Sequence, residues 1–476
     1  MAATQLAATA DAPATTTTQS NAPITFAGAV ARFKAGDVVA ANQEFMLLAN
    51  YGLATADVNL GAMAAHGISA PPNPGDALGW YTAAQQLGAP VTQEQLSELR
   101  QQAGPAGQSR SAAIVAHYGL QGVKQRLLDE MAACRDNWRE WRAANPARQE
   151  PTDFSPPKTD KRAAGWWAQY PHEGLYQGFP GAVVVRAWID VDGRAKHALI
   201  EQSFPLSWRE GFQQAVVVNL MHSRYTPAVV AGRPVASWKW FKFVFRINKD
   251  TMIESSAIKR LHTAAAHGDA AAEALWLILT RLGKTGADYT DGDEILVSSA
   301  LKGFPESEAD LYEHMCAPQP RSVWEIRAAM DGDPRVLAPL VEEAYRTTYQ
   351  STEQPQIAML LDKAATSDEP AIVRKVVWVR AWAQDPGLRD ATKALKLALG
   401  LNPANRFDPD FDLALAAAEA ANSDFDAATE AQRRAVHKAN DLGWDSAPLQ
   451  ATLKRYESRQ VDATPPAEFR STTVWQ

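Results

Sequence analysis

Hydrophobic and polar residues alternate with a period of two along residues 181–202, and this alternation predicts a pair of β-strands. One face of the first strand is formed by Val183, Val185, Ala187 and Ile189. Asp192 and Gly193 follow as a hairpin turn, because glycine tolerates the positive φ that such turns require. The second strand is then expected to cover residues 194–202.

A helix and a third strand complete this unit. The spacing predicts a helix from Ser207 to about His222 and a strand over residues 237–247. The side chains expected to face that helix are Phe241, Phe243, Phe245 and Ile247. Because the helix carries the chain back across the sheet, the last strand is expected beside the first, giving the order second, first, third. The last strand is therefore an edge strand, and its outer N–H and C=O groups can pair with another chain.

The remaining sequence has the spacing of α-helices. In residues 25–142, Gly52 and Gly88 end equivalent helices, with a period of 88 − 52 = 36 residues. Gly268 and Gly303 are separated by 303 − 268 = 35 residues. Periods in the thirties are typical of stacked helix pairs. Further helices are expected over residues 321–350 and 356–458.

Small and aromatic residues recur at fixed places in the first helical stretch. They are Ala54, Ala56, Asn59, Leu60, Gly61, Gly67, Pro72, Asp76, Ala77, Trp80, Tyr81, Ala83, Ala84 and Gly88. This pattern resembles the Sel-like repeat of the tetratricopeptide superfamily. Residues 356–458 resemble the tetratricopeptide class more broadly, with Trp378 and Trp382 ahead of a helix that begins at Arg-Asp and ends at Asn-Pro. The resemblance implies a helical solenoid.

A series of short motifs runs through residues 165–248. In chain order they are Tyr170-Pro171, residues 181–186, Asp190 to Gly193, Ala215-Val216, Tyr225 to Ala228 and Gly232 to Val235. Together they resemble the TonB C-terminal domain. Ser223 stands where that family commonly has a tryptophan, and the residues before Gly181 are unusual for it. About 225 residues follow the domain, which argues against a standard energy-transducing role.

The expected fold class is α+β and multidomain, with mostly α-helical repeat segments flanking a small TonB-like ββαβ domain. We expect a disordered leader at 1–23, a helical Sel-like repeat domain at 24–145, a linker at 146–162, the TonB-like domain at 163–250, a helical Sel-like segment at 251–350, a TPR-like helical domain at 351–460 and a flexible tail at 461–476.

The edge strand is the expected binding site. In the TonB family this edge pairs with receptor segments, so the resemblance implies that an extended peptide docks here as an additional strand. The docking strip comprises Ser237, Trp238, Lys239, Trp240, Phe241, Lys242, Phe243, Val244 and Phe245. The alternative is that neighbouring helices of the same chain cover this edge.

The sheet face opposite the helix is rich in aromatic and basic side chains. It carries Arg186, Trp188, Trp238, Trp240, Lys242 and Arg246. A monomer rarely exposes so much aromatic surface without a partner. The face is either a recognition surface, with Arg186, Trp188 and Arg246 as anchors, or it packs against a helical array of the same chain. We favour internal packing.

The sequence contains no motif of a catalytic, nucleotide-binding or metal-binding site. It has no GxxxxGK[ST], GxSxG, dinucleotide, HExxH or CxxC pattern. The stretch DGDE at 291–294 is similar to the start of a calcium loop, but the later ligands are missing. We therefore expect no cofactor and no metal, and a binding protein rather than an enzyme.

Composition and charge narrow the range of partners and compartments. With 46% hydrophobic and 21% charged residues this is an ordinary globular composition, and 476 residues are too many for one core. The net charge of -7 argues against nucleic acid or an anionic membrane. No apolar stretch is long enough for a transmembrane segment. Residues 1–23 are rich in Ala and Thr and lack the features of a signal peptide.

Cys134 and Cys316 are the two cysteines of the chain. An oxidising compartment would permit a disulfide between them, but we expect two buried thiols.

The leading hypothesis is a non-enzymatic scaffold of the bacterial cell envelope that binds a protein or an extended peptide. The resemblance to the TonB domain implies a periplasmic location, with the cytoplasm as the alternative. The alternative function is a TonB-type energy transducer, or transport partner of outer-membrane receptors, whose membrane anchor is missing from this sequence.

Overall fold

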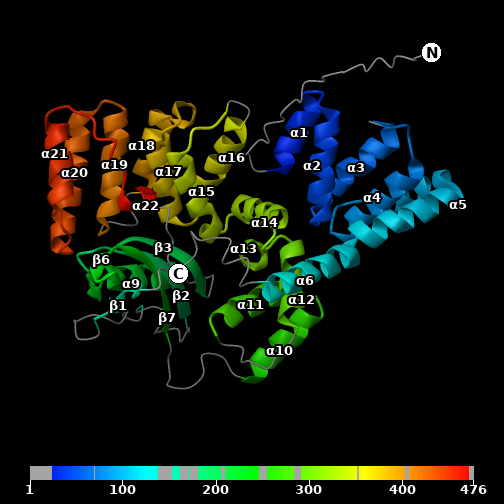
Figure 1. Cartoon of the computed structure of the whole chain (residues 1–476), viewed down its shortest axis with the longest axis horizontal. Coiled ribbons are helices and arrows are strands. Elements are labelled where there is room, and N and C mark those ends of the chain that lie inside the picture. The colour runs from blue at the N-terminus through cyan, green and yellow to red at the C-terminus, as the bar shows by residue number, and fades with distance from the viewer. Residues whose placement is uncertain are drawn as a thin grey trace, which may run out of the picture.

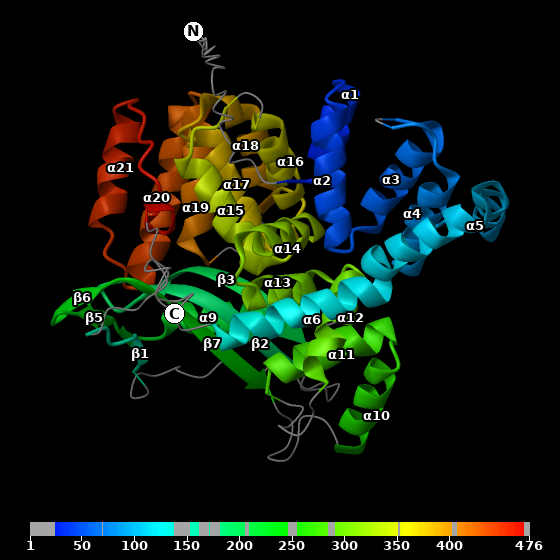
Figure 2. The same cartoon turned by 45° about the vertical axis from the view of Figure 1, so that its right-hand side comes forward.

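A computed structural model describes residues 24–68, 70–137, 153–160, 171, 181–204, 209–245, 255–283, 291–350, 353–401 and 407–470. The protein is of the α+β class, mostly helical with a small sheet portion. Figures 1 and 2 show the sheet below a row of C-terminal helices, while the N-terminal helices lie at the other end of the molecule. The predicted leader at 1–23 and Arg246 and Ile247 lie outside the described residues.

The main sheet has three antiparallel strands in the order β3-β2-β7, as predicted. They are β2 (Gly181–Ile189), β3 (Ala195–Phe204) and β7 (Ser237–Phe245). The predicted hairpin turn joins β2 to β3, and Gly193 has a φ of 71°. Two small ladders accompany the sheet: β1 (Lys158–Thr159) pairs with β4 (Tyr225–Thr226), and β5 (Ala228–Val230) pairs with β6 (Arg233–Val235).

Helix α9 (Arg209–His222) covers one face of this sheet. Its buried side chains Phe212, Val216 and Leu220 form a core with the alternating residues that the sequence assigns to one face of β2. Phe241, Phe243 and Phe245 of β7 join the same core. The prediction that these phenylalanines face the helix is confirmed.

The N-terminal helices are α1 (Phe26–Lys34), α2 (Val38–Asn50), α3 (Ala54–His66), α4 (Pro74–Gln86), α5 (Gln93–Tyr118) and α6 (Leu120–Asp136). Each contacts the next along the chain. Glycine ends several of them because it adopts a left-handed conformation at low cost. The Asp37 side chain then caps α2 by accepting a hydrogen bond from Ala40 N.

Thirteen further described α-helices follow the sheet. The middle group is α10 (Ser255–Ala266), α11 (Ala270–Arg281), α12 (Gly292–Leu301), α13 (Pro305–His314), α14 (Pro318–Asp331) and α15 (Pro334–Arg346). The C-terminal group is α16 (Gln354–Ala364), α17 (Pro370–Trp382), α18 (Ala391–Leu401), α19 (Pro409–Ala421), α20 (Phe425–Asp441) and α21 (Ala447–Glu457), with a 3₁₀ turn at Pro386–Leu388. The short helix α22 (Ala467–Arg470) is the last described element.

Hydrophobic cores extend across the predicted segment boundaries. Phe45 and Leu127 of the N-terminal helices share one buried cluster with Leu296 of α12 and Trp324 of α14. A second cluster joins Leu199 of β3 to helices from α13 to α22. The predicted segments at 24–145 and 251–350 are therefore held together by a common core.

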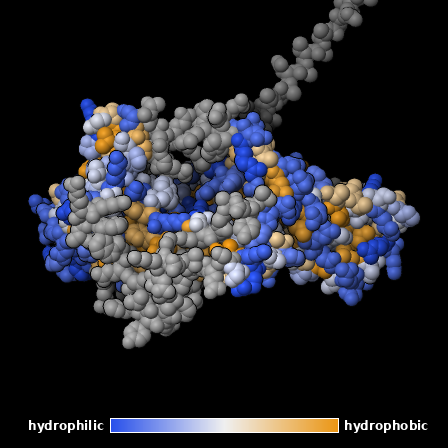
Figure 3. Space-filling view, turned by 90° about the horizontal axis from the view of Figure 1, so that it is seen from below, coloured by the Kyte–Doolittle hydropathy of each residue, from blue (hydrophilic) through white to orange (hydrophobic). Residues whose placement is uncertain are grey.

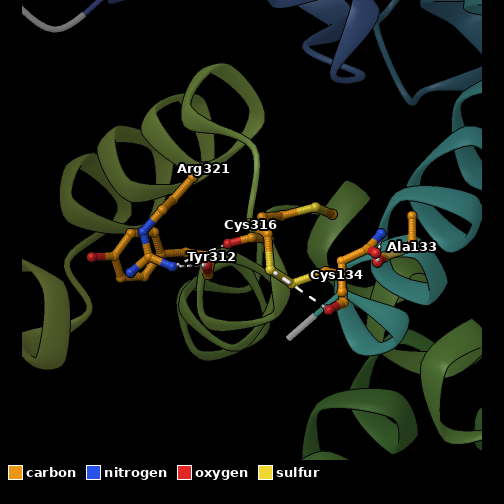
Figure 4. The surroundings of a disulfide bond; sticks show 7 residues. Ala133, Cys134, Tyr312, Cys316 and Arg321 are labelled. Carbon is orange, nitrogen blue, oxygen red and sulfur yellow. Dashed lines mark hydrogen bonds between the residues drawn. A yellow bond between two sulfur atoms is a disulfide. The ribbon is translucent and has the colours of Figure 1, made fainter. Parts of the chain in front are cut away.

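A disulfide joins Cys134 of α6 to Cys316, the second residue after α13, with the two Cα atoms 5.3 Å apart (Figure 4). The expectation of two free thiols is therefore wrong. The reason is that α6 packs against α12 and α13, which brings together residues 182 positions apart in sequence. The bond ties the N-terminal helices to the middle group.

The C-terminal segment differs from the predicted flexible tail at 461–476. Glu468 and Phe469 of α22 are 0% and 1% exposed. The Phe469 ring lies 4.8 Å from that of Tyr345, and Arg346 Nη1 donates to the Phe469 carbonyl. Docking of this segment follows from the burial of the Phe469 side chain.

The predicted linker at 146–162 is also partly structured, because β1 lies within it and Ser155 forms a bridge with Val229. Among the helices that the structure describes, none combines the length and the apolar character needed to cross a membrane.

Substitutions at two glycines can test how tightly the N-terminal and middle helices pack against each other. Gly52 and Gly88 both have positive φ, at 77° and 93°. A Cβ on Gly52 would overlap Leu301 Cδ2, whereas a Cβ on Gly88 would meet nothing within 4 Å. Gly88→Ala should cost about 1 kcal/mol from its left-handed backbone, and Gly52→Ala about 1–3 kcal/mol more from overpacking. Denaturant unfolding of both variants measures the difference, and equal losses would contradict the packed junction.

Candidate functional site

Strand β7 is paired along one side only. Its nine residues pair with β2 in a continuous antiparallel register, from Ser237 opposite Ile189 to Phe245 opposite Gly181. No other strand among the described residues pairs with β7. Within the predicted docking strip, Ser237, Trp238 and Phe245 are buried, Lys242 is exposed and the others are half-buried. Residues 239–244 are therefore the part of this strand that retains solvent exposure.

Two lysines project from β7, one on each face of the sheet. Lys239 lies on the α9 face, where its Nζ donates to the Pro157 carbonyl at 2.8 Å. Lys242 lies on the opposite face, where its Nζ donates to the Arg281 carbonyl at 3.2 Å. Partial burial lowers the pKa of both amino groups. Each face of this edge therefore presents a cation beside the backbone.

The face opposite α9 carries a group of aromatic and charged residues that we call the tryptophan cluster: Arg186, Trp188, Glu201, Trp238 and Trp240. The Arg186 guanidinium lies 4.8 Å from the Trp238 ring centre and 5.7 Å from that of Trp240. The Trp240 Nε1 donates to the Glu201 carboxylate at 3.1 Å, and Arg186 Nε lies 3.5 Å from the same carboxylate. Trp188 meets Trp238 edge to face at 5.3 Å.

Helices of the same chain cover most of the tryptophan cluster. Arg186 and Trp188 are each 5% exposed, and Trp238 is 4% exposed. Ile278 and Leu282, at the end of α11, pack on this face, and α15 and α17 contact β3. The prediction of internal packing is confirmed, and the interpretation of Arg186 and Trp188 as anchors for a partner is wrong. Arg246, the third predicted anchor, lies outside the described residues.

Burial also changes the ionisation of the tryptophan cluster. Loss of solvent raises the pKa of Glu201, although Arg186, Arg281 and the Trp240 hydrogen bond oppose the shift. In the folded protein the Glu201 carboxyl group must therefore be either protonated or balanced by a nearby cation such as Arg186.

The opposite edge of the sheet is fixed by a polar group that we call the β3 clamp: His197, Arg374, Lys375, Asp410 and Glu468. Asp410 Oδ2 accepts from the backbone N of His197 at 3.0 Å and lies 2.9 Å from its Nδ1. Arg374 lies 3.3 Å from Asp410 and 3.0 Å from Glu468. Lys375 forms ion pairs with Glu342 at 2.8 Å and with Glu468.

Charges inside the β3 clamp compensate one another. Burial alone would raise the pKa of Asp410, but His197 and Arg374 outweigh it and hold the pKa well below its ordinary value. Glu468 behaves in the same way, because Arg374 and Lys375 outweigh the effect of burial. Both carboxylates are therefore ionised and anchor β3 to α17, α19 and α22.

The sequence did not identify the β3 clamp, since its members come from four elements that are far apart in the chain. One available signal was the placement of Arg374 and Lys375 within the otherwise apolar run of α17. Charged residues inside such a run need buried partners. Within the described residues, no three His, Cys, Asp or Glu side chains are grouped so as to hold a metal ion.

No model of a known protein family matches this chain, and no curated protein matches it. The Sel-like and TonB-like assignments therefore stay predictions.

The ion pair of the tryptophan cluster can be tested with two matched variants. Glu201→Gln leaves Arg186 buried without a counter-ion and should destabilise the protein by about 3–5 kcal/mol. Trp240→Phe removes one hydrogen bond and should cost about 1 kcal/mol. Denaturant unfolding at neutral pH measures both. If Glu201→Gln were as stable as the wild type, Glu201 would be protonated in the folded protein and would not balance Arg186.

Proposed function

We propose that this chain is a non-enzymatic protein-binding scaffold of the bacterial cell envelope. In this proposal a TonB-like module lies between helical repeats and adds an extended segment of a partner protein to the open side of β7. The observation that carries the proposal is that β7 has a strand partner only on the β2 side within the described residues. Main-chain groups of residues 239–244 supply the hydrogen bonds of such pairing.

The rest of the fold presents this edge on a rigid support. The β3 clamp holds the far side of the sheet, and the tryptophan cluster fixes its covered face. A strand that is already ordered loses little conformational entropy when a partner pairs with it. Rigid anchoring therefore favours binding at β7 over rearrangement of the sheet.

The helical segments offer a separate surface for a second partner. A cavity of about 660 Å³ lies among α2, α3 and α4, and its lining includes Met46, Leu60, Met63 and Trp80. Figure 3 shows hydrophobic residues at the surface among hydrophilic ones over the N-terminal helices, on the right of that view. Methionines adapt their shape to different ligands, which suits a protein-binding groove.

The disulfide supports the periplasmic location that this proposal implies. Disulfides persist in oxidising environments such as the bacterial periplasm and are rare where thiols are kept reduced. The bond between Cys134 and Cys316 joins two helical segments, so it contributes to the scaffold's shape in that environment.

Strand pairing at β7 can be tested with proline at two adjacent positions. Successive residues of a strand direct their N–H groups to opposite sides, so either Lys242 or Phe243 has its N–H on the open side. Extended peptides are first selected from a random library on the immobilised whole chain. Of Lys242→Pro and Phe243→Pro, the variant with proline on the open side should keep the wild-type circular dichroism and bind these peptides about tenfold more weakly.

The other proline variant serves as the control, because it breaks a bond to β2 and should lose sheet structure. Hydrogen exchange adds an independent measurement: a bound peptide should slow exchange of amides in residues 239–244. Unchanged peptide affinity in the variant that stays folded would overturn pairing at this edge.

A further inference from the structure

A cavity of about 350 Å³ lies at the β3 edge of the sheet, away from β7. It is lined by residues of β3, of α17, α19, α20 and α21, and of the C-terminal segment at 462–467. Figure 1 shows these C-terminal helices standing above β3, with α22 beside them. This space, which we call the β3 cavity, is separate from the open side of β7 and from the cavity among α2, α3 and α4.

His197 lines the β3 cavity in an unusual backbone conformation. Its φ is 52°, which is uncommon for a residue with a side chain and costs free energy. The β2–β3 register shifts beside it, between Arg186 and Trp188. Such bulges redirect a side chain and are frequent near functional sites. Here the bulge turns His197 toward Asp410 and the cavity.

The contact with Asp410 determines which ring nitrogen is available to a ligand. The Asp410 carboxylate is ionised and can only accept hydrogen bonds, so the Nδ1 that lies 2.9 Å away carries the hydrogen. In the neutral ring Nε2 is then an acceptor, and in the protonated ring it is a donor. A hydroxyl group of a ligand in the β3 cavity can satisfy this atom in either state, because a hydroxyl both donates and accepts hydrogen bonds.

Aromatic residues form much of the remaining wall. Trp378, Trp444 and Tyr456 line the β3 cavity together with Pro448 and Leu449. Lys196 Nζ lies 5.2 Å from the centre of the Trp444 ring and helps to hold that ring in place. Flat apolar walls of this kind contact the CH groups of a ring-shaped ligand.

Charged side chains in the lining already have partners within the chain. Lys196 pairs with Asp190 and with Asp192, and Arg455 lies 3.5 Å from Asp462. Asp410 is neutralised by Arg374. The remaining charged residue of the lining, Asp445, is exposed and accepts a hydrogen bond from Ala447 N. An ionic ligand would therefore find no unpaired buried counter-charge, which favours a neutral one.

We propose that the β3 cavity binds a neutral, hydroxylated ring compound, namely a sugar unit of a glycan. A hydroxyl group of the sugar hydrogen-bonds to His197 Nε2, and the CH face of its ring lies against the aromatic wall. The volume of the cavity is at the lower end of small-molecule sites and suits a mono- or disaccharide.

The first test is a titration of the whole chain with glucose, N-acetylglucosamine, cellobiose and maltose. Saturation-transfer NMR and tryptophan fluorescence report binding, and inorganic phosphate and spermidine serve as charged probes. At least one sugar should bind with a dissociation constant of about 1 mM or lower, and neither charged probe should compete. Failure of every sugar to bind, or preferential binding of a charged probe, overturns the proposal.

Variants then locate the binding. In His197→Asn the amide can still donate to Asp410, and asparagine tolerates positive φ, so the fold should be kept while Nε2 is lost. Its sugar affinity should fall about tenfold, the effect of one hydrogen bond to a buried group. Trp444→Leu should weaken binding independently, and Trp382→Leu, at a half-buried tryptophan outside the cavity lining, is the matched control. Unchanged affinity in both cavity variants would show that sugar binds elsewhere.

Discussion

The structure depends on the neutralisation of two cations buried in α17. Arg374 and Lys375 are 1% and 0% exposed, and isolated charges at such depth are prohibitively unfavourable. Their partners come from distant parts of the chain: Asp410 from α19, and Glu468 from α22. The need to place these carboxylates beside α17 brings the C-terminal segment into the core. It also fixes β3, since Asp410 holds His197 as well.

This constraint makes the two edges of the sheet unequal. The β3 edge is bound to helices by ionic and hydrogen-bonded contacts, whereas β7 retains a backbone edge that no described strand pairs with. Natural sheets commonly protect an open edge with lysine. Lys239 and Lys242 occupy such positions on β7, and they discourage self-association because like charges would meet across two identical edges. An edge protected in this way can still pair with a strand that is not positively charged.

Features that depend on residues close together in the sequence could be predicted, whereas features that depend on distant residues could not. The hairpin at Gly193, the sheet order and the phenylalanine face of β7 depend on alternation and turn chemistry within about 70 residues, and all are present. The disulfide, the docked C-terminal segment and the β3 clamp depend on pairs such as His197 and Asp410, 213 positions apart. No local pattern specifies such a contact, because either residue alone is equally suited to a solvated surface.

Holding β3 against the helices does not by itself require the strained backbone and polar contacts of His197. Apolar side chains of similar volume would hold β3 to the helices at least as well, because a buried ionic contact adds little net stability. The observed arrangement instead keeps a strained backbone and binds one carboxylate oxygen of Asp410 through both the main-chain N–H and the ring Nδ1 of His197. The ring contact directs Nδ1 toward the carboxylate and so leaves Nε2 as the other polar atom of the ring. In the proposal of a sugar site, the backbone strain is the cost of placing Nε2 for the ligand.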